Sequence, residues 1–179
     1  MKIRLLIIFL RLIIPVSVFS QIHMKFMGIP IDGNVNLFCQ KLMDKGFAIE
    51  KSDLTNAYCF IGKFYGENAN IQVDYTYDTH TVYSVTVYIV KSSASALYSL
   101  QRDYLKAVEE KYKYEKEIIN PLLCQYDYWI YEGFNPIGLI QTFIVDSNSI
   151  ESIRESMLSI TYVDCENYAS FEDRKNKDI

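Results

Sequence analysis

The sequence predicts an α+β domain made of two tandem αβββ units, with antiparallel strands that carry two helices on one face. Two helical patterns are each followed by three strand-like runs, so the order of elements repeats along the chain. Similar triplets, Ile71–Val73 and Ile140–Thr142, fall at matching places in the two halves. Because polar–apolar alternation makes any two strands look alike, chance similarity remains the alternative to a duplication.

The first 20 residues have the layout of a secretory signal peptide. Lys2 and Arg4 precede an apolar run that ends in a Val-x-Ser pattern at Ser20. Arg11 and Pro15 interrupt that run, which disfavours the alternative of a retained membrane anchor. We therefore expect cleavage after Ser20 and export to the periplasm or the cell exterior. The remaining 159 residues would form a single domain over residues 21–179.

Cleavage would also change the charge of the protein. The whole chain has 18 basic and 22 acidic residues, a formal charge of −4, and loss of the leader would leave 15 basic residues and a charge of −7. Nucleic acids and anionic lipids require a positive surface. We therefore expect neither nucleic acid nor membrane as a partner of the mature protein.

The first half, residues 24–91, begins with a short extended piece and a helix. Asn34 can cap a helix whose apolar stripe includes Phe38 and Leu42. Gly46 can end this helix in a Schellman-type turn. The expected elements of this half are a helix over residues 34–45 and strands over residues 58–65, 71–78 and 82–90.

The second half, residues 92–165, repeats this order with a longer helix. Leu97 and Tyr104 belong to its apolar stripe, and Pro121 breaks the chain before the strands begin. The mixed-charge segment 166–179 is expected to be a flexible tail. The expected elements of this half are a helix over residues 94–114 and strands over residues 124–131, 139–145 and 157–163.

The segment after the leader carries a specific run of residues. It reads Phe26-Met27-Gly28-Ile29-Pro30-Ile31-Asp32-Gly33, followed by Phe38, Leu42 and Lys45-Gly46-Phe47. This pattern resembles the start of a family of uncharacterised exported proteins from gut Gram-negative bacteria, and the resemblance implies no activity and no site residues. Separately, the repeated helix-and-strand order resembles the architecture of the β-lactamase inhibitor protein and of small envelope assembly modules. Such a likeness of architecture does not set a function.

The four cysteines divide two to each half. An even number of cysteines in an exported chain permits disulfides. We expect pairing within each half, Cys39 with Cys59 and Cys124 with Cys165. Buried free thiols are the alternative, because Cys39 flanks the apolar stripe of a predicted helix.

Catalytic motifs are missing from the sequence. The chain has no G-x-S-x-G nucleophile elbow, phosphate-binding loop, dinucleotide fingerprint, H-E-x-x-H motif or CxxC pair. Its two histidines, His23 and His80, fall near the start of the mature chain and in a predicted hairpin turn. We therefore expect no catalytic residues, no metal site and no cofactor.

Tyrosine is unusually frequent, with 15 residues. Tyrosine and tryptophan side chains can form amphipathic binding surfaces for proteins or sugars. We expect such a surface at Tyr126, Tyr128, Trp129 and Tyr131. The alternative is that tyrosine simply fills half-buried positions of a sheet.

These observations favour an exported, non-enzymatic binding or assembly module of the cell envelope, with another envelope protein or a glycan as its partner. One alternative is a hydrolase that acts on envelope or dietary glycans, using carboxylates that the sequence does not single out. The other is a structural envelope component that assembles through an open sheet edge. The sequence leaves the oligomeric state open.

Overall fold

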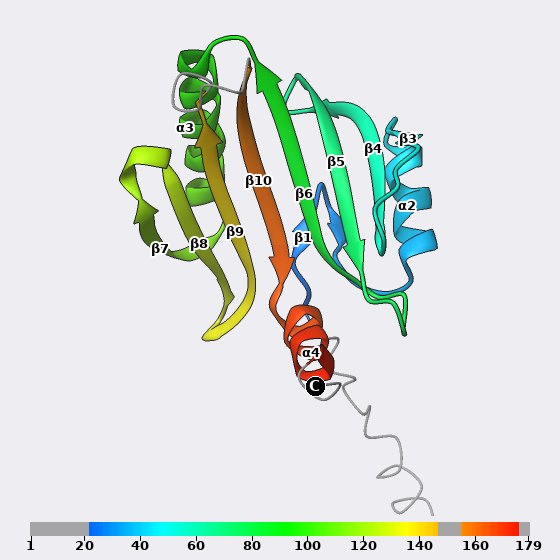
Figure 1. The fold of residues 1–179 in the computed structure, drawn as a ribbon. Helices are drawn as coiled ribbons and strands as arrows, with labels where there is room; N and C mark the ends of the chain where they lie inside the picture. The colour runs from blue at the N-terminus through cyan, green and yellow to red at the C-terminus, as the bar shows by residue number, and fades with distance from the viewer. Residues whose placement is uncertain (1–21, 147–154, 176–179) are drawn as a thin grey trace, which may run out of the picture.

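A computed structural model describes residues 22–146 and 155–175 of this chain. These residues form an eight-stranded antiparallel sheet, a two-stranded hairpin and three α-helices, which confirms the α+β fold class (Figure 1). The signal peptide expected over residues 1–20 lies outside the described residues. Within the described ranges, no helix combines the length and the hydropathy needed to cross a bilayer.

Each half of the chain contributes four strands to the main sheet, and each half also contains one helix that packs on it. The first half contains α2 (Val35–Asp44), β3 (Ala48–Glu50), β4 (Ala57–Phe64), β5 (Glu67–Tyr75) and β6 (Val82–Lys91). The second half contains α3 (Ala94–Lys111), β7 (Lys113–Asn120), β8 (Gln125–Glu132), β9 (Asn135–Val145) and β10 (Ser156–Asp164). The remaining elements are the hairpin strands β1 (Lys25–Phe26) and β2 (Ile29–Pro30), the 3-10 turn η1 (Pro121–Leu123) and α4 (Cys165–Lys175).

The strand order is β3-β4-β5-β6-β10-β9-β8-β7, so the last strands of the two halves meet at the centre of the sheet. The two edge strands, β3 and β7, are the strands that the sequence prediction missed, because it expected three strands in each half. β3 has only three residues, and β7 begins with the charged pattern Lys-Tyr-Glu-Lys-Glu. Charged edge strands are common because they discourage pairing with other chains.

Two boundaries also differ from the prediction. The helix expected over residues 94–114 ends earlier, because α3 stops at Lys111 and Tyr112 is already extended. The charged segment expected to be a flexible tail instead lies largely in α4. Asp164 caps this helix, since its Oδ1 accepts a hydrogen bond from the Asn167 N–H at 3.0 Å.

α2 begins and ends where the sequence predicts. Asn34 caps its N-terminus through the side chain. Gly46 adopts φ +91°, and the Phe47 N–H donates to the Leu42 carbonyl at 3.2 Å, as in a Schellman motif. Phe47 is buried against Gly62 of β4, where a Cβ atom would come within 2.2 Å of the ring. The chain reversal after α2 therefore also joins the helix to the sheet.

The main sheet has one covered face, which we call the helix face. α2, α3 and the β1–β2 hairpin lie on this face, behind the sheet in Figure 1. Tyr104 of α3 donates to the Tyr162 hydroxyl of β10 at 2.7 Å, and both side chains are buried. Phe26 of β1 stacks on Phe64 of β4, with ring centroids 5.7 Å apart. Phe26 also meets the Tyr162 ring edge-on at 5.2 Å between centroids, and the Phe64 and Tyr104 centroids lie 6.0 Å apart, so the two halves share one hydrophobic core.

The opposite side of the sheet, the open face, is turned toward the viewer in Figure 1. α4 lies at one end of the sheet, where Phe171 stacks on Tyr83 with ring centroids 4.7 Å apart. No other helix of the described residues covers this face. The wide open face provides one candidate binding surface, and the space between α3 and the sheet on the helix face provides another.

The expected disulfides are wrong, because all four cysteines are free thiols. Cys39 is a buried residue of α2, on the side of the helix that packs on the helix face of the sheet, and burial raises the pKa of its thiol to about 11. Cys59 belongs to the residues of β4 that point to the open face, so the sheet separates the two. Cys124 precedes β8, whereas Cys165 follows β10 at the level of the far end of β8. That separation is about 20 Å along the strands, and a disulfide requires Cα atoms within about 7 Å.

Candidate functional site

The four aromatic residues expected to form one binding surface are divided between the two faces of the sheet. Successive side chains of a strand point to opposite faces. Tyr126 and Tyr128 lie on the helix face, and Tyr128 is fully buried. Trp129 and Tyr131 lie on the open face, where Trp129 is 37% exposed. The structure therefore offers two separate candidate surfaces in place of one.

One row of side chains crosses the open face from strand to strand. In register order it contains Cys59, Gln72, Thr86, Thr161, Gln141, Asp127 and Glu117. The hydroxyls of Thr86 and Thr161 share a hydrogen bond of 3.1 Å at the centre, where β6 pairs with β10. Gln72 and Gln141 follow on either side, so the matching sequence triplets occupy equivalent positions in the sheet.

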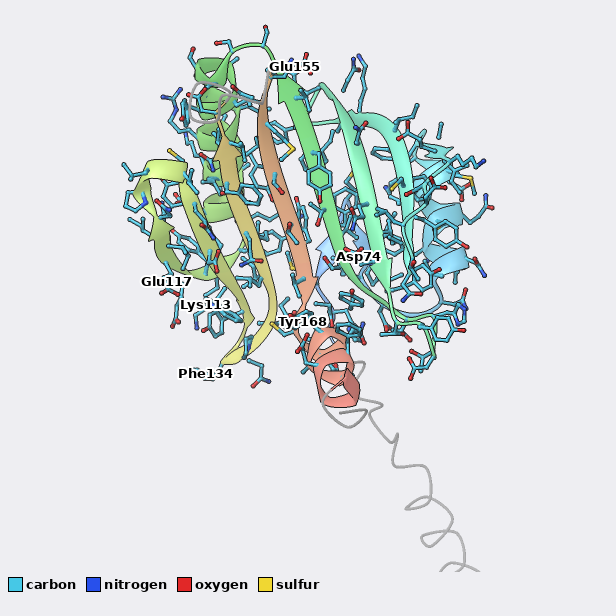
Figure 2. All side chains as sticks on the ribbon, in the orientation of Figure 1. Asp74, Lys113, Glu117, Phe134, Glu155 and Tyr168 are labelled. Atoms are coloured by element: carbon cyan, nitrogen blue, oxygen red, sulfur yellow. The ribbon has the colours of Figure 1, made fainter. Side chains whose placement is uncertain are left out.

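Each of these glutamines donates to a carboxylate on the open face. Gln72 Nε2 donates to Asp74 Oδ1 at 2.7 Å, and Gln141 Nε2 donates to Asp127 Oδ2 at 3.0 Å. Burial raises the pKa of Asp74, and the hydrogen bond from Gln72 partly opposes that shift. Figure 2 labels Asp74 over the sheet and Glu117 at its β7 edge.

Asp127 is the most unusual polar residue of the open face. It is 9% exposed, and its Oδ1 is buried without a hydrogen-bond partner in the described structure. Glu117, another acid, stands directly opposite it on β7. An unsatisfied buried polar atom costs about 1–3 kcal/mol, and more when the group is charged. Such a buried oxygen is completed by an ordered water, an ion, or a partner group that reaches it once neighbouring side chains move.

The charge of the surrounding strands makes this carboxylate more isolated. The only basic residue in β5, β6, β8, β9 and β10 is Lys91, at the end of β6, and it forms an ion pair with Glu67. The nearest cation on the open face is Lys113 at the start of β7, four residues from Glu117, and it donates to the Gly133 carbonyl at 2.9 Å. Large apolar side chains also lie on this face: Trp129 and Val90 are exposed, and the half-buried ones include Tyr88, Leu139, Phe143, Met157 and Val163.

A second candidate surface is the α3 groove, a cavity of about 760 Å³ on the helix face between α3 and strands β7 and β8. Tyr128 donates to Glu109 Oε1 at 2.7 Å, and burial followed by this hydrogen bond raises the pKa of Tyr128. Lys116 Nζ lies 3.6 Å from Glu109 Oε1 and 4.8 Å from the centre of the Tyr126 ring. The remaining lining includes Tyr98, Arg102, Leu105 and Lys106 from one stripe of α3.

Two further cavities lie in the first half of the sheet. One, of about 570 Å³, is lined by Ile61, Asn70 and Tyr88, and the other, of about 560 Å³, includes Glu50 and Tyr75. Neither these two cavities nor the α3 groove is lined by more than one carboxylate. A glycoside hydrolase requires a pair of acids at its reacting centre. Among the described residues, no cluster of three His, Cys, Asp or Glu side chains could hold a metal ion.

His23, which falls near the start of the predicted mature chain, is held between two acids. Its Nδ1 lies 3.1 Å from Asp164 Oδ2 and its Nε2 lies 3.4 Å from Asp32 Oδ2. Asp164 is 1% exposed and also accepts the Met24 N–H at 2.9 Å. This cluster fastens the start of the described chain to the end of β10 and to α4, so we assign it a structural role.

The sequence reasoning missed Asp127 and the cations of the α3 groove. The alternation of β8 could have placed Asp127 beside Trp129 on one face, because the two are two residues apart. No local signal reveals that Asp127 Oδ1 lacks a hydrogen-bond partner, since the neighbours of Asp127 come from other strands. In comparisons with protein-family models, with curated proteins and with solved structures, nothing matches this chain.

Proposed function

We propose that this protein is an exported, non-enzymatic binding module of the cell envelope, and that its open face binds a basic, partly apolar surface of another envelope protein. The observation that carries this proposal is the buried Asp127 carboxylate, one oxygen of which has no partner in the described structure. A partner that supplied an arginine or lysine side chain would complete its hydrogen bonding.

Charge and shape support a protein partner of this kind. Asp127 and Glu117 face each other across β7 and β8, and β8 itself contains no basic residue. Trp129 lies two residues from Asp127 on the same face, so a guanidinium that pairs with the carboxylate could also contact the indole ring. The half-buried Phe143 and Tyr88 would then be covered by apolar side chains of the partner. A neutral sugar would leave the charge of Asp127 uncompensated.

The first test is site-specific photocrosslinking in cells. A photoreactive amino acid replaces Trp129 on the open face, and in a matched control it replaces Leu37, a 57% exposed residue on the outer side of α2. We expect a discrete crosslinked partner from position 129 only. Equal crosslinking from both positions, or a product that contains two copies of this chain, would contradict the proposal.

The second test measures the affinity for the partner captured in this way. Asp127→Asn removes the charge of the unpaired carboxylate, and Asp103→Asn removes the charge of an exposed acid on α3 as the control. We expect Asp127→Asn to weaken binding at least about tenfold, because one buried ion pair contributes more than about 1.4 kcal/mol. Asp103→Asn should stay within about twofold of the wild type. Equal effects of the two variants would refute the role of Asp127.

A further inference from the structure

The α3 groove differs in charge from the rest of the protein. Three cations line it, Arg102, Lys106 and Lys116, against the single carboxylate of Glu109. The whole chain has a formal charge of −4, so this concentration of positive charge is local. The groove also lies on the helix face, so a ligand in it would not compete with a partner on the open face.

The three cations of the groove differ in how tightly their side chains are held. Lys116 is fixed, because Glu109 lies 3.6 Å from its ammonium group and the rings of Tyr126 and Tyr128 lie 4.8 and 5.2 Å away. Arg102 and Lys106 stand on the rim, 76% exposed, and their nearest acids lie 3.7 and 3.9 Å away. Exposed pairs at such distances contribute little, so a stronger anion can replace them.

The walls and floor between these cations are largely apolar. Leu105 and Tyr98 of α3 face Tyr126 of β8 across the cavity. Gln101 lies at the floor, 3% exposed, and its amide group donates to the Cys124 carbonyl at 2.8 Å and to Thr142 Oγ1 at 3.0 Å. The side-chain amide group of Gln101 is therefore already used within the protein. A ligand would contact mainly aromatic rings and aliphatic side chains in this part of the groove.

We propose that the α3 groove is a binding site for a small organic anion with a flat apolar body, such as an aromatic carboxylate or sulfonate. The cavity volume of about 760 Å³ lies within the range typical of small-molecule sites. The ligand body lies between Leu105 and the Tyr126 ring, and its anionic group lies at the rim between Arg102 and Lys106. Lys116 contributes a fixed positive field from the opposite wall.

Three probes that share a naphthalene body test this proposal by calorimetry. They are 2-naphthalenesulfonate, the uncharged 2-naphthalenemethanol and 2-naphthylmethylammonium. We expect the sulfonate to bind at least tenfold more tightly than the alcohol, and the ammonium to show no binding, because the site selects for negative charge. Equal binding of all three probes, or no binding of the sulfonate at millimolar concentration, would overturn the proposal.

Variants then locate the site. The double variant Arg102→Gln/Lys106→Gln removes the rim cations, and Lys41→Gln/Lys45→Gln removes two exposed cations at α2 as the matched control. We expect the first pair to weaken sulfonate binding at least fivefold and the control pair less than twofold. Tyr98→Ala, which removes part of the wall without changing charge, should also weaken it. Equal losses in both charge variants would mean unspecific attraction and refute the site, and circular dichroism checks that each variant is folded.

Discussion

The hydrogen bond between Tyr104 and Tyr162 offers a quantitative test of how α3 packs on β10 in the core. The Tyr104 hydroxyl donates to the Tyr162 hydroxyl at 2.7 Å, and the residues are only 4% and 7% exposed. Tyr162→Phe removes the acceptor and leaves the Tyr104 O–H buried without a partner, which costs about 1–3 kcal/mol. Tyr104→Phe removes the donor and leaves the buried Tyr162 hydroxyl without this partner, so its cost should fall in the same range of about 1–3 kcal/mol.

The double variant Tyr104→Phe/Tyr162→Phe should recover most of this loss. It removes both polar groups and keeps the ring volumes, so no buried hydroxyl is left unsatisfied. We expect its free energy of unfolding to lie within about 1 kcal/mol of the wild type, below the sum of the single effects. Urea unfolding of the four proteins at pH 7 gives the coupling energy as a double-mutant cycle. A double variant whose loss equals the sum of the single losses would refute this reasoning.

The same pair predicts a dependence on alkaline pH. Burial is the first cause that raises the pKa of both hydroxyls above the ordinary tyrosine value. As the pH rises above about 10, tyrosines of the unfolded chain lose their protons while Tyr104 and Tyr162 keep theirs. The folded state then binds more protons, so its stability falls with rising pH. The double phenylalanine variant should lose less stability than the wild type between pH 9 and about pH 11 in the same urea assay.

Three other substitutions test the fold. Gly62→Ala should lower the free energy of unfolding by about 1–3 kcal/mol, because the new methyl group would lie 2.2 Å from the Phe47 ring. Urea unfolding midpoints measure this loss. Adding Phe47→Leu to the Gly62→Ala variant should restore part of it, because the smaller side chain makes room for the methyl group. Asp164→Ala should cost about 2–4 kcal/mol in thermal unfolding, because this buried carboxylate accepts hydrogen bonds from two backbone N–H groups, and an unchanged melting temperature would contradict that role. Asp74→Asn should raise the urea midpoint at pH 7, because burial raises the pKa of Asp74 and its charged form therefore costs stability at neutral pH. The gain should disappear as the pH falls through that pKa, and an Asn variant less stable than the wild type at pH 7 would contradict this reasoning.

The proposed binding function rests on features that local sequence patterns carry only in part. The alternation in β8 predicts that Trp129 and Tyr131 share a face, and the structure confirms that they do. The same alternation should have excluded Tyr126 and Tyr128 from that surface. The isolation of Asp127 depends on its neighbours in β7 and β9, which lie 10 and 14 residues away in the chain.

The sequence by itself determined the elements whose signals are local. The cap at Asn34, the glycine turn at Gly46 and the alternating strands were enough to place α2 and the central part of each half, because these signals act between residues a few positions apart. The edge strands escaped prediction because an exposed edge has little hydrophobic periodicity.

Only the tertiary structure decided which strands join the two halves, which face of the sheet stays open, and which cysteines lie close enough to pair. Those outcomes depend on the pairing of β6 with β10 and on the packing of α3 across it, contacts between residues far apart in the chain. Sequence spacing allowed Cys39 and Cys59 to pair, but the sheet lies between them. The position of a side chain relative to a sheet is a property of the whole fold, and for that reason the candidate binding sites became visible only in three dimensions.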